Sequence, residues 1–271
     1  MSYPTPQKGD RPDWAALLHE AVTDPGLLLK GYRAFHRFSI SNQLLAMLQC
    51  AERGIEPGPI ATYRSWLDKG RQVRKGEKAL TLCMPVTVKA KAKDDADDAD
   101  GKAAGTRTVF VYRPNWFVLA QTDGEPATVE PLPDWSLERA LEGLNVTLVP
   151  FAHPDGNVQG YARGRELAIN PVATLPTKTA LHELAHIELG HTAKTAADTA
   201  TMPRSLVEVE AEAVALLCLA SLGLEGIEYC RGYIQSWGGR EAIPDASAQR
   251  IFGAANRILA AGREAAVEVA A

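Results

Sequence analysis

Three of the chain's six histidines lie within one short segment, LHELAHIELGH, at residues 181–191. His182 and His186 are four residues apart, so on a helix both imidazoles leave the same face, one turn apart. Two such nitrogens can bind one zinc ion, which accepts imidazole at about 2.0–2.1 Å. Glu183 is next to the first histidine, where it is predicted to act as general base towards a zinc-bound water. The segment therefore predicts a helix that carries a catalytic centre with one Zn²⁺ ion.

A third protein ligand must come from another segment, because catalytic zinc sites usually have three. In SLVEVEAEAVALL, Glu208 and Glu212 share a helical face that continues into apolar residues, and buried carboxylates need a cation. The segment EVEAE resembles the gluzincin pattern, in which HExxH is followed by a helix whose first carboxylate binds zinc and whose second, four residues later, holds a ligand histidine. The resemblance implies that Glu208 binds the ion and that Glu212 orients His182 or His186. Glu210 is expected to point away into solvent. His191, which should lie just past the end of the helix, is the alternative third ligand.

Other interpretations of these residues stay open. The histidines can pack or face solvent without an ion, and Ser205-x-x-Glu208 fits a capping box in which Glu208 only starts its helix. The gluzincin pattern of the segment EVEAE argues against both alternatives. The strand predicted in RELAIN, residues 165–170, is expected to run beside the centre and to offer an edge to an extended peptide.

A second segment with chemical potential is TYRSWLDKGRQVRKGEK, at residues 62–78. Cations that hold phosphate and rings that stack on bases are what a protein needs to bind single strands. The aromatic segment VFVYRPNWFVL, at 109–119, adds further rings. The predicted nucleic-acid contacts are Tyr63, Trp66, Lys69, Arg71, Arg74, Lys75, Lys78, Arg113 and Trp116. A basic surface loop beside core aromatics is the alternative.

The composition agrees with a water-soluble protein that meets a polyanion with one half only. Of the 271 residues, 46% are hydrophobic and 23% charged, as in globular proteins. Residues 1–93 hold 15 Lys and Arg against 8 Asp and Glu, whereas residues 94–271 hold 14 against 25. No apolar run is long enough for a membrane, no secretory signal is visible, and the four cysteines are scattered, so a cytoplasmic location is expected.

The remaining sequence predicts the elements that position these residues. In the first half we expect helices from Asp13, over 39–54 with Ser41 or Asn42 as cap, and over 61–70, then strands at 79–90 and 107–120. The acidic segment between these strands, 93–105, should be a hairpin tip. In the second half we expect a helix from Ser136, a strand at 145–151, a hairpin at 157–171, and helices at 177–191 (capped by Thr177), 204–223, 226–237 and from Asp245.

This order predicts an α+β fold with two domains. The prolines between Pro126 and Pro133 indicate a linker. The expected domains are residues 10–125, an α+β single-strand-binding domain, and residues 134–271, a zincin-like, mostly helical domain with a small sheet.

The longest family signal lies in SNQLLAMLQCAERGIEPGPIATYRSWLDKGRQVRKGEKALTLCMPV, residues 41–86, with the aromatic strand that ends in FVLAQTDG. It resembles the N-terminal domain of ArdC-type antirestriction proteins, and LHELAH with its Glu-rich helix resembles the zincin-like domain that accompanies it. The resemblance implies a plasmid-encoded protein of conjugative elements that binds single-stranded DNA and protects incoming DNA from host restriction. It implies a metal role for His182, Glu183, His186 and Glu208.

A second function is consistent with the same residues. The segment HIELGH is also similar to that of ImmA/IrrE-like metallopeptidases, which cleave regulatory proteins. The alternative is therefore a zinc peptidase that cuts one regulatory or host defence protein and uses DNA binding for targeting. A closed, structural zinc site that serves as a platform for a partner is a third possibility. Expected partners are single-stranded DNA and a protein substrate, without a membrane.

Overall fold

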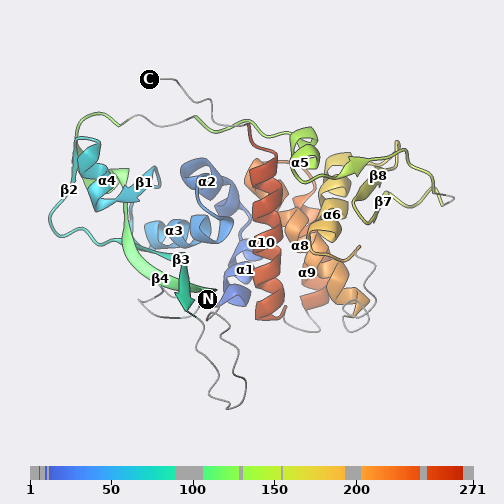
Figure 1. Cartoon of the computed structure of the whole chain (residues 1–271), viewed down its shortest axis with the longest axis horizontal. Helices are drawn as coiled ribbons and strands as arrows, with labels where there is room; N and C mark the ends of the chain where they lie inside the picture. Colours follow the sequence, from blue (N-terminus) through green and yellow to red (C-terminus); the bar gives the residue numbers. More distant parts are fainter. Residues whose placement is uncertain are drawn as a thin grey trace, which may run out of the picture.

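The computed structural model describes residues 6, 10, 12–89, 106–127, 131–153, 155–192, 203–238 and 243–264. The fold is α+β, as predicted: a mixed N-terminal half with small sheets and a mostly helical C-terminal half. The long helix α10 (Asp245–Ala261) lies in the middle of the molecule, with α1–α3 on one side and α6, α8 and α9 on the other (Figure 1).

The first half opens with α1 (Trp14–Thr23), α2 (Gly26–Phe35) and α3 (Ile40–Arg53). Helix α1 starts next to Asp13, as predicted, and the side chain of Asp13 caps it. Ser39, and not Ser41 or Asn42, caps α3. Helix α2 was not predicted, although its buried residues, Leu28, Gly31, Tyr32 and Phe35, follow a helical period.

Three antiparallel strands form the main sheet of this half, in the order β1 (Ile60–Thr62), β4 (Thr106–Val118), β3 (Leu80–Lys89). A short helix, α4 (Tyr63–Asp68), follows β1, and β2 (Arg71–Val73) pairs with β5 (Thr122–Gly124) after the 3-10 turn η1 (Leu119–Gln121). The predicted strands at 79–90 and 107–120 thus form one hairpin. The predicted acidic tip, 93–105, lies outside the described residues.

Two amides of α3 hold the outer edge of β3. The side chain of Asn42 donates to the carbonyl of Cys83 at 2.9 Å and accepts its N–H at 2.8 Å. Two turns later, the side chain of Gln49 makes the same pair of bonds with Thr81, both at 2.9 Å. Asn42 and Gln49, seven residues apart on α3, therefore bond to Cys83 and Thr81, which are two residues apart on β3. The side chains of the helix take the place of a neighbouring strand at this edge of the sheet. Asn42 is not available as a helix cap because it bonds to β3.

The second half contains α5 (Leu137–Gly143) and a small sheet in the order β6 (Thr147–Leu148), β8 (Glu166–Ile169), β7 (Gly160–Arg163). Strands β7 and β8 form the hairpin predicted at 157–171. The segment RELAIN is β8, which lies between β6 and β7 and is not an edge strand of this sheet, so the prediction that it offers an edge is wrong. The strand that lies against the HExxH helix at the end of the sheet is β7.

The other helices of this half are α6 (Pro176–Glu188), α8 (Arg204–Leu222) and α9 (Ile227–Gly238). Helix α6 starts with Pro176 after Leu175, so Thr177 is not its cap. Helix α8 starts at Arg204 after Pro203, which places Ser205 inside the helix. Ser205 and Glu208 therefore form no capping box, and that alternative for Glu208 is wrong.

The two halves share one hydrophobic core. Helix α1 packs against α10, and α2 packs against α8, whose residues 209–221 are all buried. None of the described helices is long and apolar enough to cross a membrane.

Candidate metal centre

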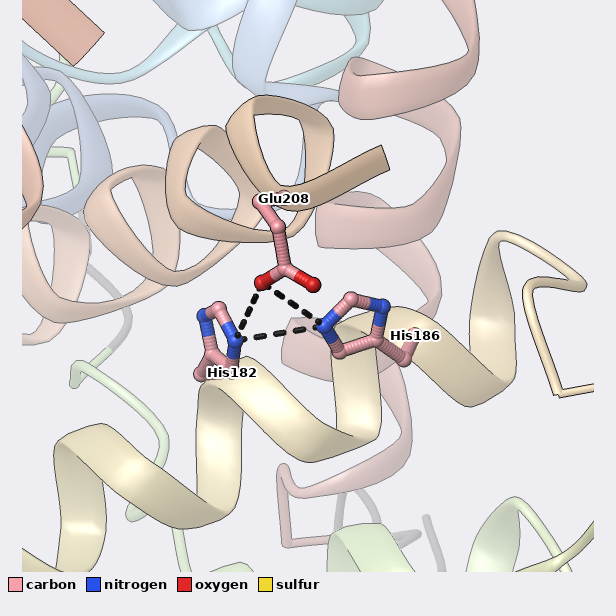
Figure 2. A group of neighbouring side chains, drawn as sticks. All are labelled: His182, His186 and Glu208. Carbon is pink, nitrogen blue, oxygen red and sulfur yellow. Dashed lines mark hydrogen bonds and ion pairs between the residues drawn. The ribbon is translucent and has the colours of Figure 1, made fainter. Parts of the chain in front are cut away.

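Helices α6 and α8 bring two histidines and one carboxylate together. Figure 2 shows the rings of His182 and His186 leaving one face of α6, with Glu208 descending between them from the first turns of α8. The Nε2 atoms of the two histidines are 3.2 Å apart, and the Oε2 atom of Glu208 lies 3.6 Å from the first and 3.7 Å from the second. Among the described residues, His182, His186 and Glu208 form the group of side chains that lie close enough together to hold a metal ion.

The triangle of ligand atoms has the size of a metal site. For bonds of about 2.0–2.1 Å, tetrahedral coordination places neighbouring ligand atoms about 3.3–3.4 Å apart. The three edges, 3.2, 3.6 and 3.7 Å, bracket that spacing. A cation at the centre of the triangle would be bound by both ring nitrogens and by the carboxylate oxygen. The nitrogen, nitrogen and oxygen donors therefore fit a divalent ion with a position left open.

Glu212 lies behind the first histidine, one turn after Glu208. Its Oε1 atom is 3.2 Å from Nδ1 of His182, though not at the angle of a formed hydrogen bond, and it accepts a 2.6 Å bond from the ammonium group of Lys178. Burial acts to raise the pKa of Glu212, but its contacts with His182, Cys230 and Lys178 outweigh burial and lower it to about 2. The carboxylate is thus charged, and Lys178 holds it close to the ring of His182.

Carboxylates dominate the electrostatics of the ligand group. Burial acts to lower the pKa of His182, but Glu208 and Glu212 outweigh it and raise the pKa to about 9. The close approach of His182 and His186 moves the pKa of Glu208 far below its usual range. This local field is negative and attracts a cation.

Glu183 lies between α6 and β7. Burial raises the pKa of Glu183, against the effect of the neighbouring histidines. Strand β7 passes very close to this side chain, because a Cβ on Gly160 would lie 3.3 Å from Cγ of Glu183 and 2.6 Å from Cγ2 of Thr179. Only glycine allows the strand and the helix to approach this closely.

Two residues behind the second histidine depart from the prediction. Glu210 is fully buried, so the expectation that it faces solvent is wrong. It lies 2.9 Å from Nε2 of His191, and Nδ1 of His191 is 3.0 Å from Nδ1 of His186. His191 therefore lies on the side of His186 away from the ligand triangle. The sequence did carry a signal for this position of His191, because His191 directly follows Gly190, a residue that typically ends a helix.

The predicted nucleic-acid contacts differ in how the structure uses them. Trp66 is only 2% exposed and its indole N–H donates to the carbonyl of Phe117, so it has no free face for a base and its predicted role is corrected. The guanidinium of Arg71 is bonded to Thr122 and to the carbonyls of Gly124 and Glu125, which holds β5 in place.

The other predicted contacts are more accessible. Arg74 pairs with Glu77 at 2.7 Å yet stays 42% exposed. The remaining members of the set are exposed, except for the half-buried Trp116: Tyr63, Lys69, Lys75, Lys78 and Arg113. Whether they touch DNA stays a prediction.

Comparisons with known proteins agree with this fold. Residues 8–116 match the family model described as the N-terminal domain of anti-restriction factor ArdC. This part of the chain is therefore similar to the ArdC N-terminal domain. The family resemblance inferred from the motifs is thereby confirmed. The comparison with curated proteins gave no match.

Two crystal structures of the antirestriction ArdC protein from the R388 plasmid have the same fold as the whole chain. The metal-free structure is 21% identical with a TM-score of 0.53, and the match covers 92% of this chain and 94% of that chain. The Mn(II)-bound structure is 20% identical with a TM-score of 0.51, and the match covers 92% and 97%. The likeness in fold therefore extends through the half that carries the His–His–Glu group.

The N-terminal half of this chain also contains an aromatic pocket that was not predicted. It has a volume of about 330 Å³ and is lined by the rings of Trp14, Phe38, Phe110 and Trp116, with Arg37 at its side. The ring of Trp116 meets that of Phe38 edge-on at 5.1 Å, and Phe110 is 42% exposed. Of the residues predicted to contact nucleic acid, Trp116 lines this pocket.

Proposed function

We propose that the chain is an antirestriction protein whose second half hydrolyses peptide bonds at one zinc ion and whose first half binds single-stranded DNA. The observation that carries the catalytic part is the His182–His186–Glu208 triangle, with Glu183 beside it on α6. The ArdC fold and the ArdC N-terminal domain support the antirestriction role. We also propose that residues 10–125 and 134–271 divide the two roles.

Zinc is the proposed ion because two imidazoles and one carboxylate are a frequent donor set for catalytic zinc. Manganese is the competitor, since the related ArdC structure was obtained with Mn(II) and carboxylate donors also suit that ion. Three protein ligands leave a coordination position for water or substrate, whereas structural zinc sites usually have four. A purely structural role is therefore the less favoured proposal.

The chain's own residues supply the proton transfers. An ion bound by the three ligands would act as a Lewis acid on a scissile carbonyl and lower the pKa of the attacking water. Glu183 takes the proton of that water and returns it to the nitrogen of the leaving amine. Burial raises the pKa of Glu183, which suits a group that must accept a proton and release it again. Glu212, held by Lys178, keeps His182 in orientation.

Strand β7 provides the proposed position for an extended substrate. It ends the sheet in the described part of the chain, and Gly160 brings its backbone against Glu183. A peptide that pairs with this edge would place its backbone above the HExxH helix. The substrate edge proposed from the structure is thus β7 instead of β8.

Single-stranded DNA is the proposed partner of the first half. The exposed cations at 69, 74, 75 and 78 form the basic turn, which attracts phosphates. The pocket formed by Phe38, Phe110, Trp14 and Trp116 offers rings on which an unstacked base can lie. Affinity would come from charge and stacking, without readout of the sequence.

Two binding measurements test the DNA proposal. Exchange of Lys75 and Lys78 for Glu should weaken binding of a labelled oligothymidine in fluorescence anisotropy. It should also reduce the slope of log affinity against log salt by about 1.4, at roughly 0.7 per phosphate contact in single strands. Arg163→Glu, an exposed cation in the second half, is the matched control. Equal affinity for oligothymidine and for a neutral polymer would refute the proposal.

A conjugation assay separates the two candidate functions. If hydrolysis of a host or regulatory protein is the active step, Glu183→Ala should abolish protection of a plasmid that enters a restricting host. If DNA binding alone protects, Glu183→Ala should protect as well as the wild-type chain. The position left open by three protein ligands favours the first outcome.

A further inference from the structure

His191 and Glu210 form a buried pair directly behind the metal-ligand candidate His186. Nδ1 of His186 lies 3.0 Å from Nδ1 of His191, and Nε2 of His191 lies 2.9 Å from Oε2 of Glu210. The side chain of His191 is 6% exposed and that of Glu210 is 0% exposed. We propose, on the basis of the metal centre proposed above, that these positioning residues lock His186 into the one tautomer that binds the ion.

The hydrogen bonds of this chain can run in one direction only. An imidazole that binds an ion through Nε2 must be unprotonated there, so neutral His186 carries its proton on Nδ1. That N–H donates to Nδ1 of His191, which therefore has no proton. The proton of His191 then lies on Nε2 and donates to Glu210. A carboxylate, which only accepts, ends the chain and fixes every proton before it.

The local fold explains why this pair is in place. Gly190 has a φ of +81°, which reverses the backbone at the end of α6. The N–H of His191 then donates to the carbonyl of His186 at 2.9 Å, so the two rings lie side by side. A histidine six residues after His186, as in metzincins, would serve as a ligand. The spacing of five instead places the ring behind His186.

Glu210 is anchored by a third element. The guanidinium of Arg250, on α10, lies 3.3 Å from the same Oε2 that accepts from His191. A fully buried carboxylate is expensive unless it is paired, so its presence on α8 requires a partner that uses its charge. His191 and Arg250 are those partners. The contact ties the metal centre to α10, the helix that also packs against α1 and α3.

The two ligand histidines are therefore supported differently. Glu212 lies 3.2 Å from the ring of His182 without a formed hydrogen bond, whereas Glu210 is linked to His186 through hydrogen bonds of the His191 ring. The three alternate glutamates of α8 have three separate roles: Glu208 as ligand, Glu210 behind His191, and Glu212 behind His182. Loss of such outer hydrogen bonds typically reduces metal affinity 10- to 100-fold.

Metal affinity of the full-length protein tests the proposal. The dissociation constant of Zn²⁺ is measured by competition with a chromophoric chelator for the wild type, His191→Ala and Glu210→Gln. Both variants should bind about 10- to 100-fold more weakly. His191→Gln keeps one acceptor and one donor and should restore at least half of the loss on a logarithmic scale. The control is His153→Ala, an exposed histidine on a loop, with unchanged affinity.

The tautomers are read directly in zinc-loaded wild type, so the test does not depend on whether a variant folds. Long-range ¹H–¹⁵N correlation should show the proton of His186 on Nδ1 and that of His191 on Nε2. The proposal would be overturned if the folded variants bound Zn²⁺ within threefold of the wild-type affinity, or if His191→Gln bound it no more tightly than His191→Ala. A proton on Nδ1 of His191 would also overturn it. If the folded wild-type protein bound no divalent ion, the proposed metal centre itself would be refuted.

Discussion

Replacement of Asn42 by leucine tests how α3 holds the edge of β3. The amide of Asn42 is 7% exposed and satisfies both backbone groups of Cys83, which is 4% exposed. Loss of both bonds leaves an N–H and a C=O without partners, at about 1–3 kcal/mol each. Burial of the leucine side chain returns roughly 1.5–3 kcal/mol. From the middle of each range, about 4 kcal/mol lost against about 2 kcal/mol returned, the free energy of unfolding should fall by about 2 kcal/mol.

Urea denaturation followed by tryptophan fluorescence measures this change. Asn42→Asp adds a sharper test, because it keeps the shape but places an oxygen against the carbonyl of Cys83 at the 2.9 Å position. It should destabilise at least as much as leucine. Gln72→Leu, an exposed amide on β2, is the control and should change stability by less than about 0.5 kcal/mol. A loss for Asn42→Leu no larger than that of the control would refute the reasoning.

Three further predictions concern the metal centre and its surroundings. Glu183→Gln should reduce peptide hydrolysis by at least about 100-fold and leave zinc affinity within about threefold, since Glu183 moves protons and is not a ligand; weakened zinc binding would contradict its role. Gly160→Ala should lower the free energy of unfolding by about 1–3 kcal/mol in a urea melt, because the new Cβ would lie 2.6 Å from Cγ2 of Thr179; an unchanged melt would mean that β7 is further from α6. In the metal-free protein, the pKa of Glu212 is lowered from 4.5 to about 2, so Glu212 stabilises the fold above pH 4.5 and this effect is lost as the pH falls towards 2. The pKa of His182 is raised from 6.5 to about 9, so His182 stabilises the fold below pH 6.5 and this effect is lost as the pH rises towards 9. Stability of the metal-free chain should therefore peak between about pH 4.5 and 6.5, and a maximum above pH 8 in thermal melts would contradict these shifts.

The ligand group could be predicted from the sequence because its geometry is local to two helices. His182 and His186 share a face through a spacing of four, and the period of α8 carries Glu208 and Glu212 to one side. Glu210 could not be placed in this way. Its partner is a histidine beyond the helix end, and only the turn at Gly190 brings the two together.

The nucleic-acid surface was harder to predict for a similar reason. Trp66 has the spacing of an exposed ring in a basic segment, but the six-residue α4 turns it into the core, where it bonds to Phe117. The pocket around Trp116 joins residues from α1, α3 and β4 and the turn before α3, which are distant in the sequence. The edge strand was misassigned because the two-residue β6, paired in parallel, covers the outer side of β8.

The central claim is that two histidines of α6 and one glutamate of α8 hold a single divalent ion. Isothermal titration of metal-free protein with Zn²⁺ tests it most directly. We predict one ion per chain for the wild type, and affinity lower by at least about 100-fold for Glu208→Ala and for His182→Ala, with both variants folded. Wild-type affinity in Glu208→Ala, or no binding by the folded wild type, would contradict the claim.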